Sequence, residues 1–242
     1  MQPVIGMILP PASGEIPLEA HGLVPEGVRF AGRGLALGEL TIEGYSAVID
    51  RTRELAKELR DREGANAIAL MGTSLSFFRG AAFNDELVRT IEDASGLPAT
   101  TMSNAICDAL TAVGARRLAV GTAYVEEVNQ RLSQFLHARG FEVLSMESLG
   151  LSEIPAIHGI TEDQVVELGK QAYEAADARA DAILISCGGL KSLNLAPRLE
   201  AATGVPAIAS ATAGVWAALR LIGIECRNPL LGSLAGLEDA AA

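Results

Sequence analysis

Two segments of the chain share one pattern of residues, and only one of them contains a cysteine. An apolar run ends in Met-Gly-Thr-Ser at 71–74, and a second apolar run ends in Ser-Cys-Gly-Gly at 186–189. Each is followed by a Gly-x-Pro-Ala stretch, and aligning the copies sets Gly72 opposite Cys187. A thiol can donate a proton to carbon or remove one, but a single thiol acts from one face only. The pattern therefore predicts a cleft between two similar halves, with a thiol on one wall and bare backbone on the other.

Cys187 is expected at a strand end, ahead of Gly188-Gly189 and a helix starting near Leu193. A cysteine after an apolar strand is commonly a small core residue. Backbone N–H groups of a glycine turn, however, can bind an anion and lower the pKa of a thiol. Together with the repeat, this context favours a catalytic thiol. Cys107, within a helical pattern, and Cys226, near the C-terminal tail, are interpreted as structural or incidental.

Hydroxyl groups stand at two other predicted strand ends. Thr73 and Ser74 offer two hydroxyls and consecutive N–H groups, which suit either a helix cap or an oxyanion hole for a carboxylate or an enediolate. Tyr124 follows a strand and carries a phenolic donor, although tyrosines often anchor loops. The residue types leave both interpretations open at these positions.

Several kinds of chemistry lack support in the sequence. No GxGxxG or GxxxxGK[ST] motif is present, so nucleotide binding is not expected. The three histidines stand in no serine- or carboxylate-linked motif, and the cysteines form no CxxC pair or zinc spacing. We therefore predict neither a metal nor a cofactor.

Composition limits the class of partner. The 242 residues are 49% apolar and 20% charged, which is typical of one large or two small globular domains. The net charge of −11 argues against nucleic acid and against an anionic membrane surface. No apolar run approaches the roughly 18–20 residues that span a bilayer, and the N-terminus lacks the features of a signal peptide. A cytoplasmic protein with free thiols and a small-molecule substrate is expected.

Short apolar runs alternate with longer helical patterns, which predicts an α/β fold with parallel strands. The expected strands are 4–9, 67–71, 99–101, 117–121, 142–149, 182–186 and 207–209. The expected helices are 42–62, 81–95, 103–113, 125–139, 162–176, 193–202 and 212–221. Residues 1–115 with about 222–242 are predicted to form one half, and residues 116–221 the other. Ligands bind at the carboxyl ends of parallel strands, so the polar turns there are expected to converge on one cleft.

Several stretches resemble the arylmalonate decarboxylases, within the aspartate/glutamate racemase superfamily. They are residues 5–14, 44–45, 71–84, 122–124 and 186–190, and the resemblance extends over nearly the whole chain. Racemases and maleate isomerases of this superfamily typically carry a cysteine in each half. Gly72 stands at the first-half position here, as in the decarboxylases.

The resemblance implies two pseudo-symmetric α/β halves with the active site in the cleft between them, and cofactor-free decarboxylation of a disubstituted malonate. One carboxylate would be bound by Thr73, Ser74, Tyr124 and the Gly188 backbone, and the other would enter an apolar pocket that favours its loss as CO2. Cys187 would protonate one face of the enediolate, giving the R acid. The positions that match the pocket are Pro10, Leu37, Leu40, Tyr45, Leu75, Ile154 and Ile157. The resemblance to the decarboxylases implies a monomer rather than a dimer, whereas related racemases often dimerise.

Two alternatives remain open. An isomerase or racemase of the same fold, acting on a small dicarboxylate or amino acid, needs an acid and a base on opposite faces, and Gly72 removes one of them. A non-catalytic small-acid binding protein is the second alternative, and the intact set of thiol and hydroxyl groups argues against it.

Overall fold

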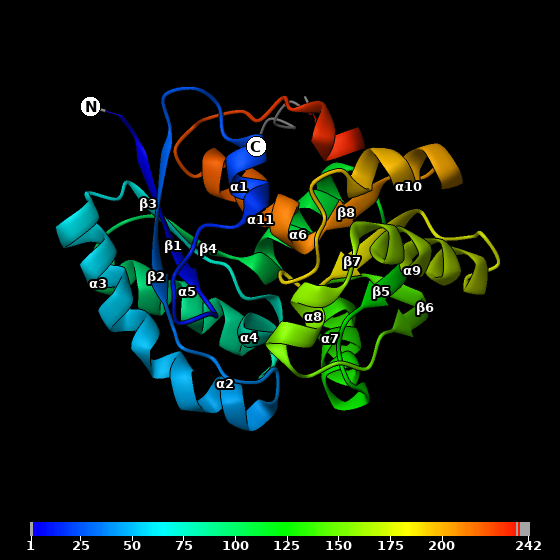
Figure 1. Cartoon of the computed structure of the whole chain (residues 1–242), viewed down its shortest axis with the longest axis horizontal. Coiled ribbons are helices and arrows are strands. Elements are labelled where there is room, and N and C mark those ends of the chain that lie inside the picture. Colours follow the sequence, from blue (N-terminus) through cyan, green and yellow to red (C-terminus); the bar gives the residue numbers. More distant parts are fainter. Residues whose placement is uncertain (1, 236, 238–242) are drawn as a thin grey trace.

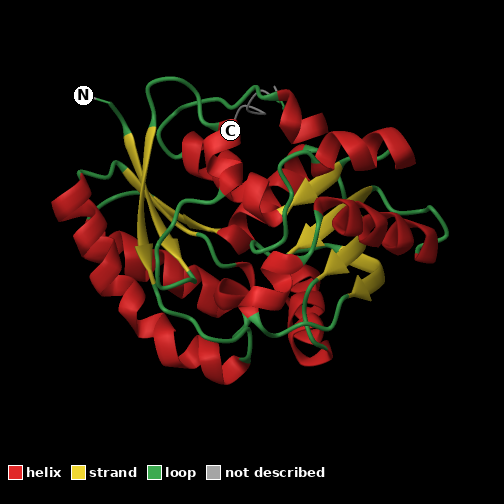
Figure 2. Cartoon of the chain, in the orientation of Figure 1, coloured by secondary structure: helices red, strands yellow, loops and turns green. Residues whose placement is uncertain are grey.

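Two parallel four-stranded sheets organise the computed structural model, which describes residues 2–235 and 237 (Figures 1 and 2). The first sheet has the order β2-β1-β3-β4, and the second has the order β6-β5-β7-β8. The strands are β1 (Val4–Leu9), β2 (Arg29–Gly34), β3 (Ala67–Leu70), β4 (Ala99–Thr101), β5 (Arg117–Thr122), β6 (Glu142–Ser148), β7 (Ala182–Ser186) and β8 (Ala207–Ala209). The predicted α/β class with parallel sheets is confirmed.

The registers of the two sheets repeat each other. Ile68 lies beside Ala99 across β3 and β4, and Ile183 lies beside Ala207 across β7 and β8. Ala67 and Ala182 likewise face the second residue of β1 and of β5. The sequence alignment that set Gly72 opposite Cys187 is therefore also the structural alignment of the two strand ends.

Eleven α-helices of the described chain connect the strands. They are α1 (Leu18–Leu23), α2 (Ile42–Val48), α3 (Thr52–Glu63), α4 (Thr73–Phe77), α5 (Ala81–Ser95), α6 (Met102–Ala112), α7 (Glu126–Ala138), α8 (Ile154–Gly159), α9 (Glu162–Ala175), α10 (Leu195–Thr203) and α11 (Ser210–Arg220). The 3₁₀ helices η1 (Ile49–Arg51) and η2 (Pro229–Leu234) add to them. The single helix predicted over 42–62 was wrong in one respect, because η1 divides it. The Thr52 hydroxyl donates to the Ile49 carbonyl at 2.8 Å and tightens the chain there.

The edge strand β2 was missed because its sequence, Arg-Phe-Ala-Gly-Arg-Gly, shows no alternation and carries two glycines. Its glycines are required by the loop that follows β1. A Cβ at Gly32 would lie 1.9 Å from the Gly14 carbonyl oxygen, and one at Gly34 would lie 2.3 Å from the Ala12 oxygen. Glycine is therefore needed at positions 32 and 34 because the backbone of the neighbouring loop comes so close, although glycine is unfavourable in a strand. This close approach also fixes the loop that begins at Pro10.

Helices α6 and α11 lie between the two sheets and pack against each other (Figure 1). Each begins directly after the last strand of its own half, yet α11 also packs against α1, β3 and β4 of the other half.

The C-terminal segment contacts both halves. Asn228 donates to the Gly22 carbonyl at 2.9 Å, and the Ser233 N–H donates to Glu200. The division at 115/116 and about 222 stays a prediction, and its residues 236 and 238–242 lie outside the described part of the chain.

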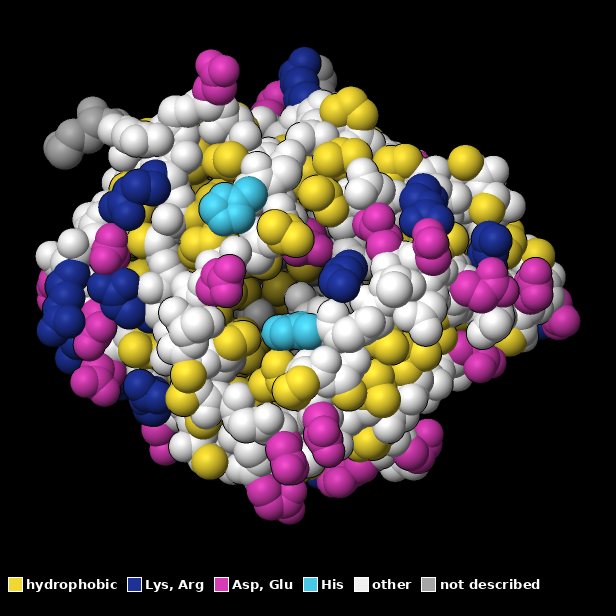
Figure 3. Space-filling model, in the orientation of Figure 1, with side chains coloured by type: hydrophobic (Ala, Val, Ile, Leu, Met, Phe, Trp, Pro, Cys, Tyr) yellow, Lys and Arg dark blue, Asp and Glu magenta, His cyan; other side chains and the backbone are white. Residues whose placement is uncertain are grey.

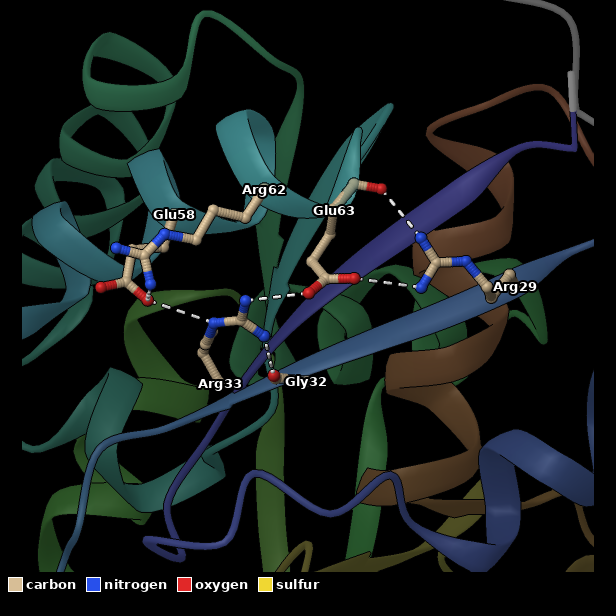
Figure 4. A network of polar contacts seen from close by, with 6 residues as sticks. All are labelled: Arg29, Gly32, Arg33, Glu58, Arg62 and Glu63. Atoms are coloured by element: carbon tan, nitrogen blue, oxygen red, sulfur yellow. Dashed lines mark hydrogen bonds and ion pairs between the residues drawn. The ribbon is translucent and has the colours of Figure 1, made fainter.

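An ion-pair network joins β2 to α3 on the outer side of the first half (Figure 4). Arg33 contacts Glu58 at 3.1 Å and Glu63 at 2.9 Å, and Arg29 contacts Glu63 at 3.1 Å. Hydrogen bonds from Arg33 and then Arg29 lower the pKa of Glu63 below its ordinary value.

Across the described residues, no helix combines the length and the apolar character needed to cross a membrane.

Candidate active site

The carboxyl ends of β3 and β7 carry the two residues that the repeat places opposite each other. Gly72 is the N-cap residue of α4, and a Cβ built on it would lie 3.1 Å from the Leu75 Cβ and 3.2 Å from the Pro10 Cγ. Both neighbours belong to the predicted pocket. At Gly72 itself the wall is therefore backbone, and the side chains closest to it are apolar.

Cys187 directly follows β7 and is 5% exposed. Its N–H donates to the Ser210 hydroxyl at 3.3 Å, which in turn donates to the Ile185 carbonyl at 3.3 Å. Burial raises the pKa of the Cys187 thiol to about 11, although N–H groups of Gly189 and Leu190 and the Tyr124 hydroxyl oppose the shift. The expected lowering of this pKa by the glycine turn was wrong, because desolvation outweighs those hydrogen bonds. The thiol is consequently protonated at neutral pH, as a proton donor must be.

Thr73 and Ser74 form the first turn of α4 and are both buried. The Thr73 hydroxyl donates to the Met102 sulfur at 3.0 Å, and thioether sulfur is a weak acceptor that a carboxylate readily replaces. The Thr73 carbonyl is held by the Ser76 hydroxyl at 2.9 Å and the Ser103 hydroxyl at 3.0 Å. The backbone of this turn is thus fixed while its side-chain donor is available.

Tyr124 connects the two walls. Its hydroxyl lies 3.5 Å from the Ser186 hydroxyl, and its ring packs edge-on against Phe77, with centroids 6.0 Å apart. Burial raises the pKa of Tyr124 well above its usual value, and the Ser186 and Thr73 hydroxyls oppose the shift. The phenol therefore lies near Thr73 as well as near the thiol. Its backbone carbonyl accepts a hydrogen bond from Asn129 at 3.2 Å, which fixes the loop.

Tyr45 differs from the purely apolar role predicted for it. Its ring packs against Phe78, with centroids 5.2 Å apart, as a pocket residue should. Its hydroxyl, however, is fully buried and has no hydrogen-bond partner among the described residues. Burial raises the pKa of Tyr45, the nearby Ser74 hydroxyl opposes the shift, and the Cys187 thiol adds to it. The pocket therefore has a polar end near Ser74.

The remaining pocket positions come from segments that meet across the cleft. The Leu37 N–H donates to the Pro10 carbonyl at 2.8 Å, and the Leu40 N–H donates to the Ser152 carbonyl at 3.0 Å. Ile157 is 1% exposed and would lie 3.1 Å from a Cβ on Gly189, while Ile154 packs partly buried against the core. A hollow opens on this face between the regions of α1 and α8, with hydrophobic side chains in its depth (Figure 3). The structure thus brings Cys187, Tyr124, Tyr45, Thr73 and Ser74 together, while the membership of Leu37, Leu40, Ile154 and Ile157 in one pocket stays a prediction.

Sequence reasoning missed the residues whose hydrogen bonds support the site residues and the loops that carry them. They are Glu19, Met102, Ser103, Asn129, Ser192 and Ser210. Ser103 and Ser210 could have been found from the repeat. Each lies just after the strand that begins at the alanine of the Gly-x-Pro-Ala stretch in its own copy. The others had no such signal, because each acts on a segment distant in the sequence or looks like an ordinary helix residue.

Comparison with known proteins assigns the chain to a family. The sequence profile of arylmalonate decarboxylase matches residues 5–235. The chain belongs to the arylmalonate decarboxylase family. It is 45% identical to an arylmalonate decarboxylase of Bordetella bronchiseptica over 91% of each chain. A crystal structure of a doubly substituted arylmalonate decarboxylase in its liganded form matches with a TM-score of 0.94 and 42% identity, covering 98% of this chain and all of the other.

A maleate isomerase from Pseudomonas putida S16 shares the fold of this decarboxylase-family chain, with a TM-score of 0.87, 22% identity, and coverage of 98% of this chain and 99% of the isomerase. The predicted racemase-like architecture of two similar halves is thereby confirmed. Membership of the decarboxylase family makes the protein an enzyme, a carboxy-lyase.

Proposed function

We propose that this enzyme decarboxylates disubstituted malonates that carry an aryl group, without a cofactor, and delivers a proton to one face of the intermediate. One observation carries the proposal. Cys187, a buried thiol whose pKa is raised by burial, directly follows β7, and Gly72 occupies the equivalent position after β3. The family relationship supports the substrate class, since the relative from Bordetella bronchiseptica is an arylmalonate decarboxylase.

Substrate binding divides the two carboxylates between unlike surroundings. The hydroxyls of Thr73, Ser74 and Tyr124, with the Gly188 N–H, bind one carboxylate. The other carboxylate lies against Leu37, Leu40, Leu75, Ile154 and Ile157, beside Pro10 and the Tyr45 ring. A desolvated carboxylate is unstable relative to neutral CO2, so this pocket favours cleavage.

Cleavage breaks the bond between the central carbon and the pocket carboxylate. CO2 leaves, and the electron pair remains on the substrate as an enediolate, whose oxygens the hydroxyls and the N–H group stabilise. Cys187 then transfers its proton to the central carbon, and the resulting thiolate recovers a proton from water. Since Gly72 offers no proton on the other face, one enantiomer results, and the family resemblance points to the R acid.

The isomerase or racemase alternative requires a second acid–base group at the Gly72 position. The side chains closest to a Cβ at this position are those of Leu75 and Pro10, and neither transfers protons. The binding-protein alternative leaves the buried protonated thiol without a purpose. Both alternatives are therefore less well supported than decarboxylation.

The direct test is turnover of 2-methyl-2-phenylmalonate by the EDTA-treated protein, with the enantiomeric composition of the 2-phenylpropionate product measured by chiral chromatography. We expect rapid conversion to one enantiomer. No turnover, together with isomerisation of a smaller dicarboxylate, would reject the proposal in favour of the isomerase alternative.

The thiol itself supplies a second test. Its pKa of about 11 predicts that alkylation of Cys187 by iodoacetamide is slow near neutral pH and accelerates as the pH rises toward 11. Peptide mass spectrometry separates Cys187 from Cys107 and Cys226. A Cys187 pKa measured below 7 would remove the protonated donor on which the mechanism depends.

A further inference from the structure

One carboxylate in the molecule is buried and takes no part in the proposed reaction. Glu19, in α1, is 7% exposed and is the one charged residue among the buried residues of the described chain. Its Oε1 accepts hydrogen bonds from the Ser192 N–H at 3.0 Å and the Ser192 hydroxyl at 3.2 Å. Among the described residues no lysine, arginine or histidine forms an ion pair with it. Burying a carboxylate without a cation costs free energy, and this cost indicates that the contact between Glu19 and Ser192 has a function.

The partner of Glu19 lies in the loop that begins with the catalytic cysteine. The loop leaves β7 at Cys187, turns through Gly188 and Gly189, and reaches Ser192 before α10. Its first residue is fixed by the Ser210 hydroxyl, and the Leu190 N–H donates back to the Cys187 carbonyl at 3.2 Å. Glu19 fixes the loop at Ser192, and Glu162 fixes its end, because its carboxylate accepts a hydrogen bond from the Asn194 N–H at 2.7 Å. Without Glu19, the stretch between the two glycines and Asn194 would lose its hydrogen bonds to α1, and the glycine backbone on its other side rotates easily.

Helix α1 contacts this loop at a second point on the same face. A Cβ on Gly22 would lie 2.6 Å from the Leu193 Cδ1, so the loop packs directly on the helix backbone there. Glu19 and Gly22 are three residues apart and therefore share one side of α1. The contact joins the two halves, because α1 follows β1 of the first sheet and the cysteine loop follows β7 of the second.

We propose that Glu19 is a positioning residue, which anchors the Cys187 loop from the opposite half so that the thiol faces the carbon to be protonated. The inference rests on the proposed function for its effect on turnover. The anchoring of the Cys187 thiol by Glu19 does not itself depend on decarboxylation.

The test compares three variants of the whole protein. Glu19→Met removes the acceptor with little change in volume, Glu19→Gln keeps an Oε1 that can accept both hydrogen bonds, and Glu26→Met makes the same change at an exposed glutamate. We expect Glu19→Met to lower kcat about tenfold to a hundredfold, since small misplacements of a reacting group have effects of this size. The minor enantiomer of the product should become measurable. Glu19→Gln should restore most of the rate, and Glu26→Met should match the unmodified protein.

Two further readouts separate positioning from general damage. The affinity of the arylacetate product analogue phenylacetate should change much less than kcat in Glu19→Met, because Thr73 and Ser74 bind the carboxylate from the other wall and only the Gly188 N–H lies in the Cys187 loop. Alkylation of Cys187 by iodoacetamide should accelerate as the loop loosens. If wild-type protein fails to decarboxylate but Glu19→Met still accelerates this alkylation, the proposed function is rejected and the anchoring role stands.

The proposal is overturned if a folded Glu19→Met protein keeps the wild-type kcat, product enantiomer and alkylation rate. It is also overturned if kcat falls only in proportion to a loss of phenylacetate affinity, which would indicate collapse of the whole site. Should Glu19→Met not fold, Ser192→Ala tests the same contact from the other side. It removes one of the two hydrogen bonds, so a smaller change of the same sign in kcat and alkylation supports the anchor, and no change rejects it.

Discussion

The turn after β3 and the turn after β7 occupy equivalent places and do different things. Residues 72–74 read Gly-Thr-Ser, and residues 187–189 read Cys-Gly-Gly. One turn therefore carries hydroxyls and no thiol, and the other carries a thiol and no further side chains. Met102 explains why the second turn has glycine at position 188. Its sulfur accepts a hydrogen bond from the Thr73 hydroxyl at 3.0 Å and would lie 2.8 Å from a Cβ on Gly188, so a larger residue would not fit there. The fold sets where chemistry can happen, and the side chains divide charge binding and proton transfer between two copies of one turn.

The largest effect is expected from Cys187→Ser. A hydroxyl is a much weaker acid than a thiol, so we expect kcat to fall by about a thousandfold, within the range for loss of a general acid. Affinity for phenylacetate should change little. Cys226→Ser is the matched control, because that thiol is also buried but donates to the Leu23 carbonyl and contacts none of the proposed site residues through a hydrogen bond. Full decarboxylation by Cys187→Ser would show that another group protonates the intermediate.

Exchanging the two turns gives the sharpest test of their opposition. Gly72→Cys should add a proton donor on the second face, so the product loses enantiomeric purity and an enantiopure 2-phenylpropionate slowly racemises. Combined with Cys187→Ser, it should give mainly the opposite enantiomer. Decarboxylation should slow in both, since the new Cβ lies 3.1 Å from the Leu75 Cβ and 3.2 Å from the Pro10 Cγ. Unchanged product stereochemistry in Gly72→Cys, with the new thiol shown to be accessible to iodoacetamide, would contradict the opposed geometry.

How much of this asymmetry was predictable depends on the distance over which each residue acts. The inner strands β1 and β7 are fully buried and read as continuous apolar runs, so their bounds were predicted correctly. Gly72 and Cys187 emerged from the repeat, because equivalent strand ends keep equivalent spacing. The short helices α4 and α8 escaped notice, since each is too brief to show a 3.6-residue period.

The supporting residues were beyond the reach of local patterns. Glu19 stands in a Leu-Glu-Ala-His segment that reads as a solvated helix face, and its hydrogen-bond partner lies 173 positions away in the sequence. The pKa of Cys187 was mispredicted for a related reason. The glycine turn is visible in the sequence, whereas the degree of burial that outweighs it depends on both halves.

A smaller effect is expected from the hydroxyl wall. Thr73→Val keeps the shape of the side chain and removes one donor, so we expect kcat to fall by about a hundredfold while the product remains one enantiomer. The retained stereochemistry distinguishes this wall from the thiol wall. Thr203→Val is the control, because its hydroxyl donates to the Leu199 carbonyl within α10 and should leave kcat unchanged. A loss of enantiomeric purity in Thr73→Val would show that the two turns do not act separately.

The smallest effect is expected away from both turns, in the network that joins β2 to α3. Arg33→Gln should leave kcat unchanged and lower the free energy of unfolding by about 0.5–1 kcal/mol, the usual scale for partly exposed ion pairs. Glu63 has a pKa below its ordinary value of 4.5, so its contribution is fully present above that pH and is lost as the pH falls through the lowered pKa. Urea unfolding of the two proteins should therefore differ at pH 7 and converge at acidic pH. Arg62→Gln, whose side chain is 68% exposed and lies 3.8 Å from Glu58, should change stability less. A fall in kcat with Arg33→Gln would mean that the strand end at Gly72 depends on the outer edge of its sheet, and the two turns would then differ in their support as well as in their side chains.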